Sequence, residues 1–183
     1  MPANDIARSQ LFTEPEGVMK AVLALWPSGL PLVMVCIGTD RVTGDALGPL
    51  VGTNLERLGM PVYGTLAEPI HATNFKTDWH QKVQALSATH WVIGVDAEVG
   101  DASTIGKVRV WPGSVNAGLG TGALLPAFGG CWVTGVTGYG SPGSASGIWG
   151  ARLFDVHCLA DIIINALYNA FETRGRPTIP REA

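Results

Sequence analysis

The residues best suited to chemistry are two aspartates that follow apolar runs. Asp45 lies in the loop or first helical turn after Leu32–Ile37, and Asp96 directly follows Trp91–Val95. Ligands of open parallel sheets bind beyond the carboxyl ends of the strands, and a common doubly wound order places the first and third strands side by side. We therefore expect the two carboxyl groups to face each other across one crevice.

A close pair of carboxyl groups has a defined chemistry. The two groups cannot both ionise freely, so the pKa of one rises and the pair shares a proton. Such a pair can activate water as a base and protonate a leaving amine as an acid. Simpler roles stay open, with Asp45 as a helix N-cap and Asp96 as a turn acid that closes its strand. Glu98 either orients a partner or, as we favour, is a solvated loop acid.

Further polar side chains belong to loops expected at the same edge of the sheet. Asp40 follows the first strand, and Glu68 and His71 follow the second. Together with Asp45, the last two could help to hold a divalent metal. Their spacing matches no strong metal signature, and a structural role for His71 is favoured. We predict no metal and no cofactor, and we assign Asp40, Glu68 and His71 to substrate binding.

The elements that must position these residues can be located from apolar spacing. Helices are predicted over 16–26, from about residue 46 to Leu58, and over 76–87 and 148–173; strands are predicted over 32–37, 61–65, 91–95, 107–111 and 131–136. Alternating strands and helices indicate an α/β fold, a three-layer sandwich around a mostly parallel sheet. We expect one domain over residues 1–183, with flexible tails at 1–15 and 175–183.

Composition excludes several classes of protein. The chain has 183 residues, of which 46% are hydrophobic and 15% are charged, so it is not a disordered protein. A net charge of -3 provides no basic field for a nucleic acid or an anionic membrane. The longest apolar runs are far shorter than the ~20 residues that span a bilayer.

The cysteines and the first residues indicate a reducing compartment. Cys36, Cys131 and Cys158 have no paired spacing and lie in apolar stretches, which argues against a disulfide framework or a structural zinc site. The segment 1–16 is polar and has no apolar core of a signal peptide. We therefore expect a cytoplasmic protein.

One long stretch carries no charge. Between Arg109 and Arg152 there is no Asp, Glu, Lys, Arg or His, and this stretch holds half of the 24 glycines. Such a segment is expected to pack against something rather than to form a solvated loop. A buried, tightly turning connection with one strand is the simplest interpretation, and a subunit interface or a groove for an extended substrate is the alternative.

Four segments resemble the signature of the YyaC family of sporulation proteins. They are Cys36–Gly52, Gly64–Asn74, Ile93–Ala97 and Pro112–Gly118, and the first is long enough to be specific. The resemblance covers about Leu32–Leu167.

This family is similar to the germination protease of spore formers, which degrades small acid-soluble spore proteins, and to hydrogenase-maturation endopeptidases. The resemblance implies a phosphorylase/hydrogenase-maturation-protease-like α/β fold, with the two catalytic aspartates of the germination protease falling on Asp45 and Asp96. In the maturation enzymes the acid that matches Asp45 is a nickel ligand. The glycine-rich stretch, with Gly118, would present its backbone to an extended substrate.

The resulting expectation is a sporulation-associated aspartic-type endopeptidase in the forespore or mother cell of a spore-forming bacterium. Its partners would be protein or peptide substrates such as small spore proteins, and it could form a homo-oligomer; nucleic acids and membranes are not expected partners. One alternative is a catalytically inactive binding or assembly protein on the same fold. Another is a metal-dependent maturation peptidase.

Overall fold

The computed structural model describes residues 9–114, 127–140 and 146–174. Its centre is a six-stranded sheet with the spatial order β1-β5-β6-β4-β2-β3. The strands are β1 (Gln10–Phe12), β2 (Leu32–Cys36), β3 (Val62–Tyr63), β4 (Trp91–Gly100), β5 (Val108–Pro112) and β6 (Cys131–Tyr139). The α/β class predicted from the sequence is confirmed.

The sheet is mixed. Strand β2 runs parallel to β3 and β4, and β4 runs parallel to β6. Strand β5 is antiparallel to β6, and β1 is antiparallel to β5. The predicted side-by-side arrangement of the first and third apolar strands is therefore confirmed as the β2–β4 pair, whereas the β5 edge departs from a parallel sheet.

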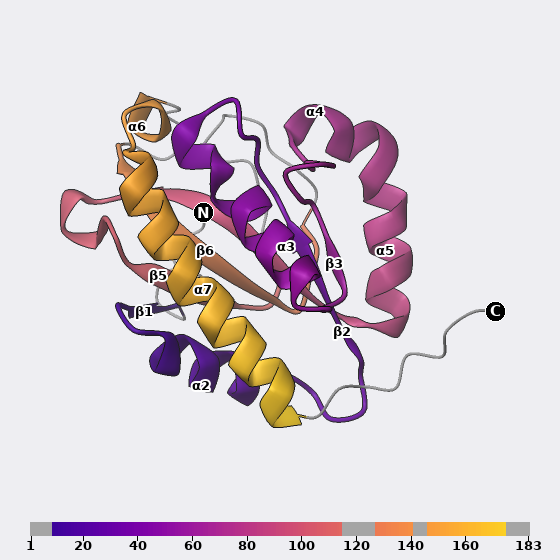
Figure 1. The fold of residues 1–183 in the computed structure, drawn as a ribbon. Helices are drawn as coiled ribbons and strands as arrows, with labels where there is room; N and C mark the ends of the chain where they lie inside the picture. The colour runs from indigo at the N-terminus through magenta and orange to yellow at the C-terminus, as the bar shows by residue number, and fades with distance from the viewer. Residues whose placement is uncertain (1–8, 115–126, 141–145, 175–183) are drawn as a thin grey trace.

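Helices cover both faces of the sheet. The longer helices are α2 (Pro15–Leu25), α3 (Leu47–Arg57), α5 (His80–Thr89) and α7 (Leu153–Arg174), and the short ones are α4 (Ala72–Asn74) and α6 (Ser146–Trp149). Single turns of other helix types lie at η1 (Thr43–Ala46), η2 (Phe75–Trp79) and η3 (Ala102–Thr104). Figure 1 shows α2, α3 and α7 lying across one face, with α5 apart from them.

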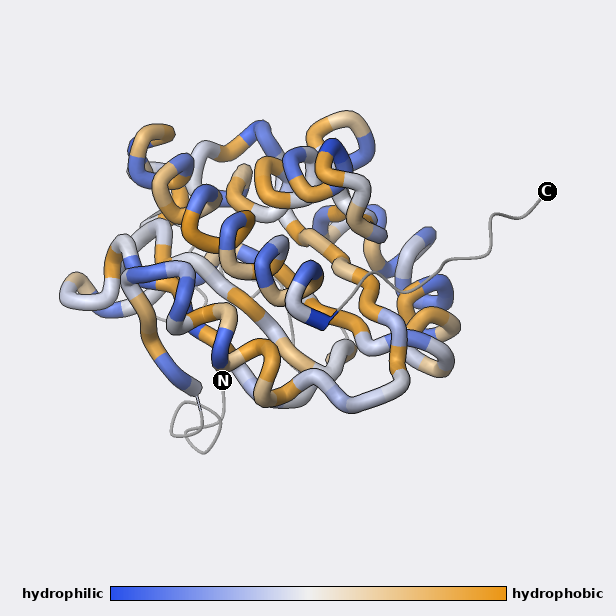
Figure 2. Tube along the Cα trace, turned by 60° about the horizontal axis from the view of Figure 1, so that its bottom comes forward, coloured by the Kyte–Doolittle hydropathy of each residue, from blue (hydrophilic) through white to orange (hydrophobic). Residues whose placement is uncertain are grey.

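Strand β2 shows why two faces are needed. All five of its residues are buried, which is typical of a strand covered on both sides. Because side chains alternate along a strand, Met34 packs in a cluster with α2, α3 and α7, and Val35 packs in a second cluster with Phe75 and Val83. In Figure 2 the inner strands are mostly hydrophobic, while the helices alternate between hydrophobic and hydrophilic residues.

The last predicted helix is divided in the structure. The sequence predicts one helix over 148–173, but α6 ends at Trp149 and α7 begins at Leu153. The intervening Gly150 is a poor helix former, and the backbone carbonyl of Arg152 accepts hydrogen bonds from the N–H groups of Asp155 and Val156, which start the new helix.

Three further sequence expectations meet the structure here. Residues 10–12, placed in a flexible tail by the sequence, pair with β5 as β1. The uncharged stretch includes the predicted strand, β6, which is buried from Cys131 to Gly138, whereas much of the predicted tightly turning connection, 115–126 and 141–145, lies outside the described residues. Among the described residues, no helix is long and apolar enough to cross a membrane.

Candidate functional site

The candidate site lies where the sheet changes its direction of growth. After β2 the chain adds β3 on one side, and it then returns to add β4 on the other side of β2. Crevices for ligands form at such switch points, beyond the carboxyl ends of the strands. Asp45 and Asp96 both belong to this edge, and each is only 7% exposed.

Asp45 is held by the backbone that leaves β2. It lies in η1, and the backbone N–H of Thr39 donates to its Oδ2 at 3.0 Å and to its carbonyl oxygen at 3.1 Å. The carboxyl group therefore ties η1 to the end of β2, and no side-chain bond of this kind caps α3. The N-cap role considered for Asp45 is wrong.

Two glycines allow this close return of the chain. Gly38 has a φ of +141°, and a Cβ there would collide with the carbonyl oxygen of Asp45. A Cβ on Gly48, in the first turn of α3, would collide with the carbonyl oxygen of Ile37. The spacing of these glycines in the sequence thus brings η1 and α3 directly onto the end of β2.

Asp96 is inside a strand rather than after it. Strand β4 continues to Gly100, so the role of a turn acid is wrong. Asp96 lies in register with Thr134 of β6, and its Oδ1 accepts a hydrogen bond of 2.8 Å from the N–H of Ala97. Pairing with β6 carries the strand past this acidic residue to Gly100.

The end of β2 connects the two acids. The N–H of Ile37 donates to the carbonyl of Val95, next to Asp96, at 2.7 Å. Two residues later, the N–H of Thr39 donates to Asp45. The structure therefore brings both acid-bearing segments to one short piece of backbone at the switch point.

Burial changes the protonation of the groups here. Burial raises the pKa of Asp45 from 3.8 to about 6, although the N–H of Thr39 acts in the opposite direction. Burial, followed by the negative charge of Asp96, also raises the pKa of the Cys36 thiol. Asp45 can therefore keep or release a proton near neutral pH, which a solvated aspartate does not do.

Sequence reasoning missed a polar network next to Asp96. The Nε of Arg109 donates to both carboxylate oxygens of Glu98, at 3.0 and 3.2 Å. The hydroxyl of Thr134 donates to Glu98 at 2.6 Å, and the indole N–H of Trp111 donates to Thr134 at 2.9 Å. The expectation of a solvated loop acid at Glu98 is wrong.

A signal for this network was available in the sequence. Residues two apart in a strand share a face, so Glu98 had to follow Asp96 onto the same side once β4 continued. The side chains of Arg109 and Glu98 are only 12% and 16% exposed. This mostly buried ion pair links β4 to β5 beside Asp96, and the bond from Thr134 adds β6 to the network.

The remaining predicted site residues are placed differently. Asp40 and Glu68 are exposed loop residues, and His71 is partly buried with its N–H donating to the side chain of Asn74 at 2.8 Å. Gly118 lies outside the described residues. Across the described ranges, no three His, Cys, Asp or Glu side chains gather to hold a metal ion, so Asp45, Glu68 and His71 do not form such a set.

Comparison with known proteins places this chain in a family. The family described as "Protein of unknown function (DUF1256)" matches residues 11–166. The chain belongs to this family. It is also 41% identical over 112 residues to the Bacillus subtilis (strain 168) protein described as "Uncharacterized protein YyaC". That match covers 60% of this chain and 54% of the relative, so the chain spans about half the length of the relative it matches. The predicted membership of the YyaC family is supported.

Proposed function

We propose that the protein is a sporulation-associated endopeptidase that hydrolyses peptide bonds with an aspartate dyad, Asp45 and Asp96. The observation that carries the proposal is the placement of two buried carboxyl groups at the switch point. The carboxyl group of Asp45 accepts a hydrogen bond from Thr39, and Asp96 follows Val95, whose carbonyl accepts one from Ile37. The raised pKa of Asp45 adds to it, because a proton-sharing pair needs one carboxyl group that is protonated near neutral pH.

The proposed chemistry assigns one role to each acid. Ionised Asp96 takes a proton from a water molecule as its oxygen attacks the peptide carbonyl carbon. Asp45, which holds its proton because it is buried, protonates the amine as the carbon–nitrogen bond breaks. Each role requires the two groups to be in opposite protonation states, and the raised pKa of Asp45 suits it to the role of the acid.

The surroundings of the dyad fit a polypeptide substrate. We assign the helix-covered sheet to the three-layer, phosphorylase/hydrogenase-maturation-protease-like fold. In this proposal Asp40, Glu68 and His71, in the loops after β2 and β3, contact the substrate, as does Gly118. The protein acts in the cytoplasm of the forespore or mother cell on small spore proteins, and it can assemble as a homo-oligomer.

One observation favours a second function, that of a catalytically inactive binding or assembly protein. Trp149, Leu153 and Phe154 are large hydrophobic residues with exposed fractions of 66%, 57% and 67%. Adjoining exposed residues of this type mark protein-binding surfaces. This surface is compatible with an endopeptidase too, so activity has to be measured directly.

The test is cleavage of a small acid-soluble spore protein by the wild type and by the variants Asp45→Asn and Asp96→Asn. Loss of general acid–base catalysis is expected to lower kcat/KM about 10²- to 10⁴-fold. Asp161→Asn, on the exposed side of α7, is the matched control and should retain full activity. Cleavage by either site variant within twofold of wild type would reject the dyad, and absence of cleavage by the wild type would favour the binding protein.

A further inference from the structure

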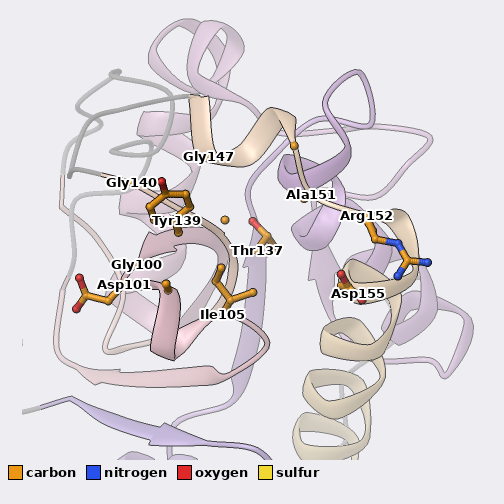
Figure 3. A pocket seen from close by; sticks show the side chains of 13 residues that line it. Gly100, Asp101, Ile105, Thr137, Tyr139, Gly140, Gly147, Ala151, Arg152 and Asp155 are labelled. Carbon is orange, nitrogen blue, oxygen red and sulfur yellow. The ribbon is translucent and has the colours of Figure 1, made fainter.

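A cavity of about 1260 Å³ opens beside the carboxyl ends of β4 and β6 and the start of α7. Figure 3 shows Thr137 in its centre, with Tyr139 on one side and Arg152 and Asp155 on the other. We call it the glycine-lined cavity, because its wall includes Gly100, Gly138, Gly140, Gly147 and Gly150. None of the residues assigned to the aspartate dyad lines it.

Thr137 is placed in this wall by an irregularity of the sheet. Glu98 of β4 pairs with Val136, but the next residue, Val99, pairs with Gly138. Thr137 is therefore the extra residue of a β-bulge, a device that re-aims a side chain near functional sites. Without this bulge, Thr137 would take a regular place in the ladder of β6.

The hydroxyl of Thr137 is buried without a hydrogen-bond partner in the part of the chain that the structure describes. The residue is only 7% exposed, and among the described residues its Oγ1 is the one buried side-chain oxygen or nitrogen without a hydrogen-bond partner. Burying a hydroxyl in this way costs stability, and native proteins rarely do so. A hydroxyl that lines a cavity and lacks an internal partner is suited to a partner that enters from outside.

The charges around the cavity select among ligands. Asp101 and Asp155 contribute two negative charges and Arg152 contributes one positive charge, so the lining has a net negative charge. This lining repels phosphate groups and attracts a basic side chain. The space that a Cβ would fill is open at Gly150, so another main chain can approach closely there, whereas at Gly138 and Gly147 this chain's own carbonyl oxygens occupy that space.

The size and rim of the cavity favour a polypeptide over a small molecule. Its volume exceeds the roughly 300–1,000 Å³ of sites for small ligands. Tyr139 lines the cavity and is 65% exposed, and Trp149 and Phe154, which flank the lining segment 150–152, are similarly exposed. Large exposed aromatic residues are typical anchors for protein partners.

We infer that the glycine-lined cavity binds an extended polypeptide segment with small side chains and one lysine or arginine. The hydroxyl of Thr137 bonds the main chain of this segment, and Asp101 and Asp155 attract its basic side chain. The inference rests on the proposed function in one respect, since it takes the bound segment to be the substrate of the aspartate dyad. It names a subsite that lies outside the dyad.

The experiment measures binding rather than cleavage. A fluorescein-labelled peptide of glycine and alanine with one central lysine is titrated by fluorescence anisotropy with the full chain, as wild type and as Asp45→Asn. A second peptide has glutamate in place of lysine. The lysine peptide is expected to bind about tenfold more tightly than the glutamate peptide, and equally well to both proteins.

Variants of the cavity locate the binding. Thr137→Val keeps the side-chain shape and is expected to weaken binding about fivefold, while its unfolding midpoint stays the same or rises. Asp155→Asn is expected to weaken binding of the lysine peptide about threefold. Asp161→Asn, on the same helix but outside the cavity, should bind like the wild type.

Four outcomes would overturn the inference. These are no binding of the lysine peptide up to about 1 mM, equal or tighter binding of the glutamate peptide, unchanged binding by Thr137→Val, and a lower unfolding midpoint of Thr137→Val, which would show an internal role for its hydroxyl. Cleavage that requires Asp45 but has the same KM in Thr137→Val would reject the subsite and keep the dyad. Binding of the lysine peptide without any cleavage of the spore protein would reject the dyad and keep the binding site.

Discussion

Asp45 and Glu98 are two acids near the same edge of the sheet, but the protein treats their charges in opposite ways. Glu98 accepts hydrogen bonds from the guanidinium group of Arg109 and the hydroxyl of Thr134. Asp45 accepts from the main-chain N–H of Thr39, and no cation in the described part of the chain forms an ion pair with it. Its pKa rises to about 6 because burial is not offset by a positive charge.

The difference separates a structural acid from one available for chemistry. A carboxylate that is hydrogen-bonded to arginine holds its strands in place. A buried carboxyl group without such a partner keeps its proton to a higher pH, at a cost to stability, and catalytic groups show this pattern. Asp96 lies at the same edge of the sheet as both acids. The network of Glu98 holds the strands around Asp96 in place, and the proposed chemistry of Asp96 depends on Asp45.

The largest effect is expected from breaking the structural pair. Arg109→Met removes the cation and leaves Glu98 mostly buried, so the free energy of unfolding at pH 7 should fall by about 3 kcal/mol. Urea denaturation followed by tryptophan fluorescence measures it. The control is Lys20→Met, which breaks the exposed Glu16–Lys20 pair and should have no measurable effect. An equal loss in both variants would mean that burial gives the Arg109 pair no special weight.

The second effect is the pH dependence of stability that the buried carboxyl group of Asp45 causes. Between pH 4 and 6 the unfolded chain releases the proton of Asp45, while the folded protein keeps it, so the folded protein binds more protons and its stability falls as pH rises. One pKa unit corresponds to about 1.4 kcal/mol. The rise from 3.8 to about 6 therefore destabilises the wild type by about 3 kcal/mol above pH 6.

Asp45→Asn removes this penalty and can still accept the hydrogen bond from Thr39. The variant should match the wild type at pH 4 and be more stable by about 2–3 kcal/mol at pH 8, as measured by urea denaturation at both values. Asp161→Asn, which alters an exposed carboxyl group, serves as the control and should show no such dependence. A gain of the same size at pH 4 and pH 8 would show that burial of the charge of Asp45 is not its cause.

The sequence was sufficient to predict that Asp45 and Asp96 lie at one edge of the sheet. Apolar runs such as Leu32–Ile37 are long and continuous enough to be strands buried on both faces, and the neighbouring β2 and β4 follow a common topology. Asp96 directly follows one such run and Asp45 lies in the segment after another, so their shared edge could be predicted. Their catalytic role stays a prediction.

The parts that the sequence did not reveal depend on pairing between distant strands. At Asp96 the continuous apolar run ends, and only the ladder with β6 carries β4 on to Gly100. The pairing of Glu98 with Arg109 and the bulge at Thr137 both arise from that ladder, and neither has a local pattern. The same holds for β1, whose three residues are a strand only because β5 is beside them.

The smallest effect compares one substitution at two positions of β6. Thr134→Val removes a hydroxyl that donates to Glu98 and accepts from Trp111, which leaves the buried indole N–H of Trp111 without this acceptor, while Glu98 keeps its bonds from Arg109. The free energy of unfolding should fall by about 1–2 kcal/mol. Thr137→Val removes a hydroxyl with no partner among the described residues and should leave it unchanged or raise it. Thermal and urea denaturation of both variants provide the comparison.

If Thr137→Val were destabilised as much as Thr134→Val, the two hydroxyls would be equivalent structural groups. If only Thr134→Val is destabilised, β6 carries one hydroxyl that holds the fold together and, three residues later, one that the fold leaves available.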